Sequence, residues 1–269
     1  MKEEHFTYEV RGPIALIGFD RAEKRNAISD GVIDQLEAVV RRASAESKVG
    51  VIYGHGRHFS AGLDLVEFAR KSPTESLFGS QRWHAVFDQI QRGRIPFVAA
   101  LHGAVIGGGL ELAASTHLRV ADETAFFALP EGQRGIFVGG GGSVRIARMM
   151  TAARMTDLML TGRTLDVVEA ERFSLVNYVV PPGKALDKAC ELADKIAKNA
   201  PLSNYAITNA LPRIQDLSQE NGLFVESLLS SYTQGSPEAI ERLEMFVNKQ
   251  SERVAPPSIR SGNKETVSR

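Results

Sequence analysis

Two glutamates and a glycine triplet could support proton-transfer chemistry in this sequence. The triplet at 107–109 comes two residues before Glu111, where the residue types predict the start of a helix. Glycines at a helix N-terminus leave backbone N–H groups free to bind a negatively charged oxygen. Glu131 comes later in the chain. Two neighbouring carboxyl groups rarely ionise together, so such a pair can supply a base and an acid at one pH.

The elements around the glutamates are predicted to bring them together. An apolar run at 98–101 is typical of a strand buried on both faces, and it precedes the glycine-rich turn. Strand-like segments at 118–121 and 125–127 then follow the helix. A helix followed by a returning strand can place the second carboxylate beside the first. The free N–H groups would form an oxyanion site, which suits chemistry through a thioester enolate.

Other glycine motifs do not fit this segment. Gly103 and Gly108 have the spacing of a phosphate-binding P-loop, but Gly109 and Leu110 stand where it needs Lys and Ser or Thr. Leu112 stands where a dinucleotide-binding motif needs its third glycine. The G-x-S-x-G nucleophile motif is absent from the sequence. Phosphate cradling and serine hydrolysis are therefore not supported.

Composition excludes several other classes of protein. The chain has 269 residues with 32 basic and 32 acidic side chains, so its zero net charge implies no general affinity for nucleic acid or anionic membranes. Cys190 is a single cysteine, and His55 and His58 lack the spacing of a metal site. The N-terminus has no apolar signal segment and no run is long enough to span a membrane, so we expect a cytoplasmic protein.

Several segments, taken in order, resemble the enoyl-CoA hydratase/isomerase (crotonase) family. They are 20–27, 58–65, 102–111, 127–143, 161–163 and 246–249. The resemblance implies an α/β fold, a spiral of β-β-α repeats with a C-terminal helical oligomerisation region. We expect a catalytic core over 1–195, helices over 196–254 and a disordered tail over 255–269.

The resemblance also implies an activity. The backbone N–H groups of Leu63 and Gly108 would form the oxyanion hole for a thioester carbonyl. Glu111 would help to activate water, and Glu131 would deliver a proton to the α-carbon. Having both glutamates favours an enoyl-CoA hydratase, which adds water across the 2,3-double bond. Another reaction of the family (isomerase, lyase or hydrolase) stays open, as does a non-catalytic scaffold or RNA-binding member.

Coenzyme A would be part of the substrate, with no metal or redox cofactor. By the same resemblance its contacts would come from six residues: Lys24, Arg25, Ala27, Ala61, Phe246 and Lys249. The last two would act partly across a subunit boundary in a homotrimer or a dimer of trimers. The segment 68–91, which contains Trp83 and other aromatic residues, would line the acyl pocket or pack in the core.

Four positions depart from the usual hydratase pattern. Gln133 and Arg134 replace an apolar pair, Val138 replaces a proline, and His117 stands where aspartate is common. If the side chain of Arg134 points inward, we expect it to lower the pKa of Glu131.

Local signals also predict where helices begin and end. Ser29 and Asp30 are expected to begin one helix, while Ser143 and Thr151 are expected to cap two more. Gly162 is expected to end a helix, and Pro212 to break one.

Overall fold

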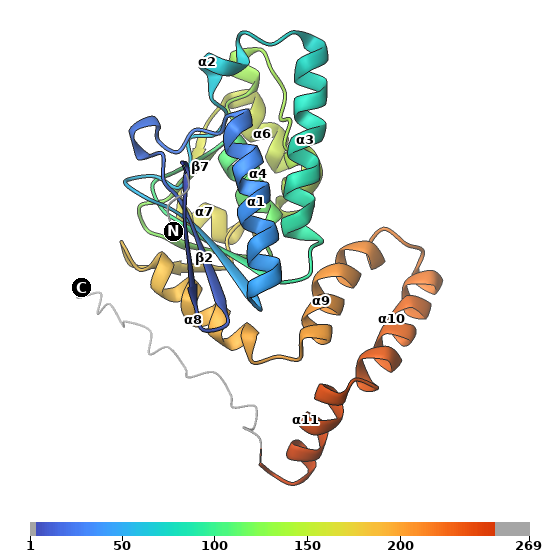
Figure 1. Ribbon diagram of the computed structural model, residues 1–269. Coiled ribbons are helices and arrows are strands. Elements are labelled where there is room, and N and C mark those ends of the chain that lie inside the picture. Colours follow the sequence, from blue (N-terminus) through green and yellow to red (C-terminus); the bar gives the residue numbers. More distant parts are fainter. Residues whose placement is uncertain (1–3, 251–269) are drawn as a thin grey trace, which may run out of the picture.

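A computed structural model describes residues 4–250 of the chain and gives a layered α/β architecture (Figure 1). The main sheet has the strand order β1-β2-β3-β4-β6-β9. Only β1 and β2 are antiparallel, and the other neighbours are parallel. The strands are β1 (Phe6–Arg11), β2 (Ile14–Phe19), β3 (Val49–Gly54), β4 (Phe97–Leu101), β6 (Leu118–Asp122) and β9 (Tyr178–Val180). The predicted α/β class is confirmed.

A smaller sheet positions the site. Its strands run in the order β5 (Ala104–Ile106), β7 (Phe126–Ala128) and β8 (Thr164–Leu165). β5 and β7 are parallel, with Ile106 opposite Ala128 at their ends. The segments that follow these two strands therefore start side by side.

Helices cover both faces of the main sheet. The N-terminal ones are α1 (Asp30–Glu46), α2 (Leu65–Phe68), α3 (Pro73–Gln91) and α4 (Gly108–Ser115). The next are α5 (Gly142–Met150), α6 (Ala152–Thr161), α7 (Val167–Arg172) and α8 (Ala185–Ala197). The chain continues with α9 (Pro201–Ile214), α10 (Gln219–Gln234) and α11 (Pro237–Val247). Two short 3-10 helices, η1 (Ala22–Lys24) and η2 (Gly132–Arg134), lie in loops near the site.

Strand β2 is buried on both faces, as a parallel strand between two helical layers should be. Ile14 and Leu16 pack in the apolar cluster that includes the inner face of α8. Ile17 and Phe19 belong to the larger cluster on the other face, together with Leu36 of α1. The alternation follows from the two-residue period of a strand.

Two of the predicted helix boundaries are confirmed. Ser29 is the N-cap of α1, where its hydroxyl accepts a hydrogen bond from the N–H of Val32 at 3.3 Å. Gly162 adopts the left-handed conformation directly after α6. Both residues have the local chemistry that the cap position requires.

Two other predicted helix signals were wrong, and Thr151 was right in position only, as the N-cap residue of α6. Ser143 lies inside α5, because left-handed Gly141 precedes the helix and lets it begin at Gly142. Thr151 precedes α6 but its side chain makes no capping hydrogen bond. Pro212 lies inside α9 without breaking it, because a proline removes one backbone hydrogen bond and tertiary packing, here of α9 against α10, can override this local preference.

The C-terminal helices α9–α11 extend away from the layered body (Figure 1). α9 and α10 pack against each other, and α8 packs on the main sheet. The expected domain boundary after residue 195 falls in the last turn of α8. The expected tail over 255–269 lies outside the described residues. Within residues 4–250, no helix is both long and apolar enough to cross a membrane.

Candidate active site

Glu111 is fixed by the N-terminus of α4 and by a glycine loop. It lies in the first turn of α4 and is buried, with an exposed fraction of 3%. Its Oε1 accepts hydrogen bonds from the N–H groups of Gly140 and Gly142, each at 2.8 Å. Burial raises the pKa of Glu111, and these N–H groups and the charge of Arg145 oppose the rise. Glu111 is therefore a buried carboxyl group, and two backbone hydrogen bonds hold its Oε1 in position.

Glu131 reaches the same place from the other parallel strand. The N–H of Gly107, which follows β5, donates to the carbonyl of Ala128 at the end of β7 at 3.0 Å. Glu131 comes three residues after Ala128, and its carboxylate packs against Gly107. A Cβ at Gly107 would lie 2.6 Å from Oε1 of Glu131, and Gly107 has a φ of +52°, so both space and backbone conformation require glycine.

The carboxyl group of Glu131 is left without hydrogen bonds on one side. Its Oε2 is buried and has no hydrogen-bond partner among the described residues. The pKa of Glu131 is raised to about 7, chiefly by burial and also by the negative charge of Glu111, while a backbone hydrogen bond and the charge of Arg134 oppose the rise. Glu131 is therefore protonated in part near neutral pH.

The N–H groups of Leu63 and Gly108 are adjacent and free. Ile28 accepts a hydrogen bond from Asp64 and donates one to Gly62, so the N–H of Leu63 between them points elsewhere. Within the described part of the chain, neither the N–H of Leu63 nor that of Gly108 has a protein acceptor. A Cβ built on Gly108 would lie 3.5 Å from the nitrogen of Leu63. The pair can bind one developing oxyanion.

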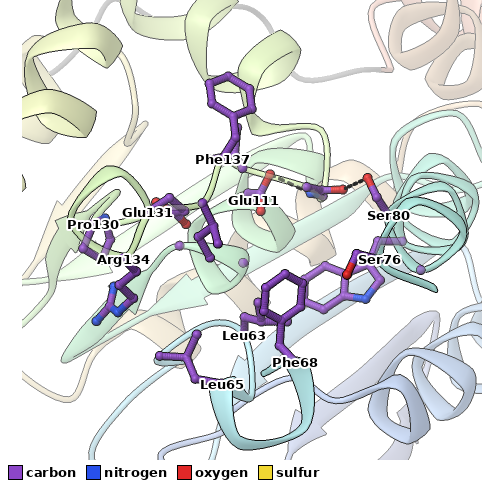
Figure 2. A pocket seen from close by; sticks show the side chains of 18 of the residues that line it. Leu63, Leu65, Phe68, Ser76, Ser80, Glu111, Pro130, Glu131, Arg134 and Phe137 are labelled. Atoms are coloured by element: carbon purple, nitrogen blue, oxygen red, sulfur yellow. Dashed lines mark hydrogen bonds between the residues drawn. The ribbon is translucent and has the colours of Figure 1, made fainter. Parts of the chain in front are cut away.

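These groups line one cavity of about 420 Å³. Figure 2 shows Glu111 and Glu131 close together, with Leu63 below them. In the same view Pro130 and Arg134 lie at one end, and Ser76 and Ser80 at the other. The apolar side chains on the wall and rim are Leu65, Phe68, Leu77, Trp83, Ile106, Ile136, Phe137 and Val138. An apolar acyl thioester fits this lining.

Gln133 and Arg134, the two residues near Glu131 that differ from the usual hydratase pattern, lie in different surroundings. Gln133 lies outside the cavity, where its Nε2 donates to the carbonyl of Thr161 at 3.1 Å. Arg134 lines the cavity. The expectation that Arg134 lowers the pKa of Glu131 is confirmed, but burial has the larger effect and the pKa stays raised.

His117 has a structural role. Its Nδ1 accepts from the N–H of Phe97 at 2.9 Å, and its Nε2 lies 3.1 Å from the carbonyl of Gln91. Burial lowers its pKa to about 4, so it is neutral at physiological pH. His117 does not line the cavity.

Asn26, which sequence reasoning did not single out, ties the first loop to the site. Its side chain is fully buried, accepts from the N–H of Arg21 and donates to the carbonyls of His55 and His58. The Ser60 hydroxyl in turn donates to the carbonyl of Asn26 at 2.7 Å. The available signal in the sequence was a polar residue in a charged loop. This signal could not reveal the role of Asn26, because the carbonyls that it binds lie far away in the sequence.

The expected coenzyme A residues fall into two groups. The N–H of Ala61 donates to the carbonyl of Arg25 at 2.9 Å, so the loop with Lys24, Arg25 and Ala27 lies against the cavity wall at Ala61. Phe246 and Lys249 lie in and after α11, and neither lines the cavity of its own chain. Phe246 is 64% exposed.

Arg145 is a second positioning residue that the sequence did not reveal. It is buried, and its Nη1 donates to the carbonyl of Gly140 at 2.9 Å. Its Nε donates to Gln91 at 2.7 Å, and its Nη2 to Asp88 at 2.5 Å. Arg145 thereby connects α3 to α5 and to the glycine loop, and this loop in turn donates the hydrogen bonds to Glu111.

The model of one protein family matches residues 9–254, and that family is described as enoyl-CoA hydratase/isomerase. The chain belongs to the enoyl-CoA hydratase/isomerase family. Enoyl-CoA hydratase EchA19 of Mycobacterium tuberculosis is 30% identical over 90% of this chain and 93% of its own. The 2,3-dehydroadipyl-CoA hydratase of Escherichia coli is 30% identical over 88% of this chain and 93% of its own.

A solved structure supports the same family at the level of the fold. It comes from Rhodopseudomonas palustris CGA009 and is provisionally described as an enoyl-CoA hydratase. It has a TM-score of 0.89 and 47% sequence identity, covering 91% of this chain and 95% of that one. The enoyl-CoA hydratase/isomerase fold predicted from the sequence motifs is confirmed.

Proposed function

We propose that the protein is an enoyl-CoA hydratase, a hydro-lyase that adds water across the 2,3-double bond of an enoyl-CoA thioester. One observation carries the proposal: two buried carboxyl groups and two unpaired N–H groups share a single cavity. Such a site can stabilise an enolate and move two protons without assistance from other residues.

In this proposal the thioester carbonyl oxygen binds between the N–H groups of Leu63 and Gly108. A water molecule lies between the carboxyl groups of Glu111 and Glu131. Glu111 accepts a proton from water while the water oxygen forms a bond to the β-carbon. The double-bond electrons move onto the carbonyl oxygen and give an enolate, whose negative charge the N–H pair stabilises. As the enolate collapses, the α-carbon takes a proton from Glu131.

The different environments of the two glutamates support these roles. Two N–H bonds to Oε1 favour the ionised form of Glu111, as a base requires. The pKa of Glu131, raised to about 7, keeps a proton available at neutral pH, as an acid requires. A pair whose pKa values are set by separate neighbours is the usual basis for assigning acid and base.

Coenzyme A would extend from the thioester past Ala61 and Ala27, with its phosphates near Lys24 and Arg25. Support comes from the hydrogen bond between Ala61 and Arg25, which holds this loop against the cavity. Lys249 and Phe246 would contact the coenzyme bound to a neighbouring subunit. We place the enzyme in the cytoplasm, with coenzyme A as part of the substrate and no cofactor of its own.

A homotrimer or a dimer of trimers is part of the same proposal. The C-terminal helices expose large apolar side chains, which a partner surface would cover. They include Leu211, Leu223, Phe224, Leu228, Tyr232, Leu243 and Phe246. Light scattering on Phe224→Asp, with Glu220→Gln on the same helix as a control, should give a smaller species for the former alone. An unchanged mass would contradict the assigned interface.

The function is tested with short, branched and aromatic enoyl-CoA thioesters, following loss of the conjugated double bond and product mass. A gain of one water is expected, and Glu111→Gln and Glu131→Gln should each lower kcat by roughly 100-fold or more. Glu123→Gln changes an exposed glutamate outside the cavity and should keep full activity. A product of unchanged mass would indicate an isomerase, and a cleaved thioester a hydrolase.

A further inference from the structure

Arg134 is held at the cavity by a short, well-defined turn. Its backbone N–H donates to the carbonyl of Glu131 at 2.9 Å, and the N–H of Gly135 donates to Gly132 at 3.2 Å. Gly135 adopts the left-handed conformation that ends this turn. The neighbouring Gln133 is bonded to Thr161, on the side away from the cavity. The two consecutive side chains of η2 therefore point in different directions: Gln133 points away from the cavity, and Arg134 lines it.

The charge of Arg134 is not neutralised. Within residues 4–250 the guanidinium group of this exposed residue makes no salt bridge or hydrogen bond, and it acts on the carboxyl group of Glu131 only through its charge. Lys71 also lines the cavity, but its Nζ lies 2.6 Å from the carboxylate of Asp30. In the view of Figure 2, Arg134 is drawn between Pro130 and Leu65, whose side chains are apolar. The cavity thus contains an unpaired cation in an otherwise apolar stretch of its rim.

A guanidinium group at a binding site is best matched by a carboxylate, which it binds through two parallel hydrogen bonds. Resting on the function proposed above, we propose that Arg134 binds a carboxylate on the acyl part of the substrate. The preferred substrate is then a CoA thioester of a dicarboxylic acid, in which the second carboxylate is free.

The position of Arg134 favours the acyl group over the phosphates of coenzyme A. Arg134 follows Glu131 by three residues, and Glu131 acts at the α-carbon in the proposed reaction. The pantetheine arm separates the thioester from the nearest phosphate, and Lys24 and Arg25 lie in the loop proposed for the phosphates. An anion that reaches Arg134 is therefore more readily supplied by the acyl chain.

A bound carboxylate would also favour the acid form of Glu131. The positive charge of Arg134 opposes the raised pKa of Glu131. Pairing with a substrate carboxylate would cancel that influence, so Glu131 would retain its proton when the matching substrate is bound. Substrate selection and proton supply would thus be linked through one side chain.

Equilibrium binding tests the proposal without requiring turnover. The probes are hexanoyl-CoA and the mono-CoA thioester of hexanedioic acid, which differ only in the terminal carboxylate. Arg134→Gln should weaken binding of the dicarboxylic thioester by about 10- to 100-fold and that of hexanoyl-CoA by less than about 3-fold. Arg134→Lys keeps the charge and should lie between the wild type and Arg134→Gln.

N-acetylcysteamine thioesters lack the phosphates of coenzyme A. Thioesters of this kind with the same two acids show whether Arg134 binds the acyl carboxylate or a phosphate. A selective loss for the dicarboxylic thioester on both carriers supports the proposal. An equal loss for both CoA thioesters, with none for the N-acetylcysteamine thioesters, assigns Arg134 to a phosphate and overturns it. Equal binding of all probes by wild type and Arg134→Gln also overturns it. Arg94→Gln removes an exposed arginine outside the cavity and should leave all four affinities unchanged.

These results are separable from the proposed reaction. The matching enoyl thioesters are assayed for hydration with the same variants. If the wild type hydrates none of them but binds the dicarboxylic probe through Arg134, the proposed hydration is wrong and the proposed binding of a carboxylate by Arg134 is right. If hydration proceeds with no dependence on Arg134, the reaction is right and the recognition is wrong.

Discussion

Glu111 and Glu131 face the same cavity but differ in their hydrogen bonds. Oε1 of Glu111 accepts two backbone N–H groups, whereas Oε2 of Glu131 is buried with no partner in the described part of the chain. The first arrangement favours a carboxylate and the second a neutral acid. Burial raises the pKa of both groups, and the hydrogen bonds to Glu111 oppose that rise. This difference makes several measurable predictions.

The stability of the folded protein should depend on pH through Glu131. Its pKa is raised from 4.5 to about 7 on folding, so the folded state binds this proton more tightly. The resulting stabilisation is complete below pH 4.5 and is lost as the pH rises through about 7. Urea denaturation should show wild type losing up to about 3 kcal/mol relative to Glu131→Gln across this range. A constant difference between the two proteins would contradict the raised pKa.

Arg134 should set the alkaline limit of activity. In the proposed mechanism the rate falls as Glu131 loses its proton, above about pH 7. Arg134 lowers the pKa of Glu131, so Arg134→Gln should move this alkaline limb of the pH–rate profile to higher pH. The measurement is kcat/KM against pH with a neutral enoyl-CoA substrate, and Arg134→Lys should retain the wild-type limb. A shift to lower pH would show that the influence of Arg134 has the opposite sign.

Gly62 should tolerate no side chain. It has a φ of +85°, and a Cβ there would lie 2.4 Å from the carbonyl oxygen of Ile106 and 3.0 Å from the nitrogen of Gly108. Because both neighbours are backbone atoms next to the oxyanion site, Gly62→Ala should displace the N–H pair. We expect a loss of more than about 2 kcal/mol in stability and a fall in kcat.

Gly12→Ala is the matched control for that change. Gly12 also has a positive φ, +55°, but a Cβ there meets nothing within 4 Å. Only the backbone strain of about 1–2 kcal/mol should appear, with full activity. Similar stability and kcat in the two variants would remove the clash at Gly62 as an explanation.

Asn26 should be important for stability although it is not in the cavity. Asn26→Ala would leave the N–H of Arg21 and the carbonyls of His55 and His58 without their partner. We expect a loss of about 3 kcal/mol in denaturation experiments and weaker binding of acyl-CoA, because the first loop loosens. Asn221→Ala, at an exposed site on α10, should change stability by less than about 0.5 kcal/mol. Equal effects of the two substitutions would rule out this role.

The sequence predicted most elements but fewer of their ends. Ser29 and Gly162 were recognised because their side-chain chemistry and backbone preference act locally. Ser143 was misassigned because the left-handed turn at Gly141 depends on neighbouring segments, whereas Thr151 occupies the predicted N-cap position of α6 without a side-chain hydrogen bond. Pro212 was overestimated as a helix breaker because tertiary packing, here of α9 against α10, can override a local preference.

The chemistry of the site could be predicted to a similar extent. The glycine triplet and the two glutamates were singled out as candidate reacting groups, since the residue types carry that information, and Gly107, Gly108, Glu111 and Glu131 all line the cavity. Arg134 and Gln133 looked equivalent in the sequence, but only Arg134 lines the cavity. Neither Asn26 nor Arg145 was identified, because the carbonyls that they bind lie in other segments.

The sequence by itself determined the strands buried on both faces, the glycine-dependent turns and the presence of two glutamates in the segments around them. Only the tertiary structure decided that Glu131 returns to Gly107, that Leu63 and Gly108 present adjacent N–H groups, and that Phe246 lies outside the cavity of its own chain. Periodicity and turn preference act over a few residues, whereas the parallel pairing of β5 with β7 is settled by packing between segments distant in the chain.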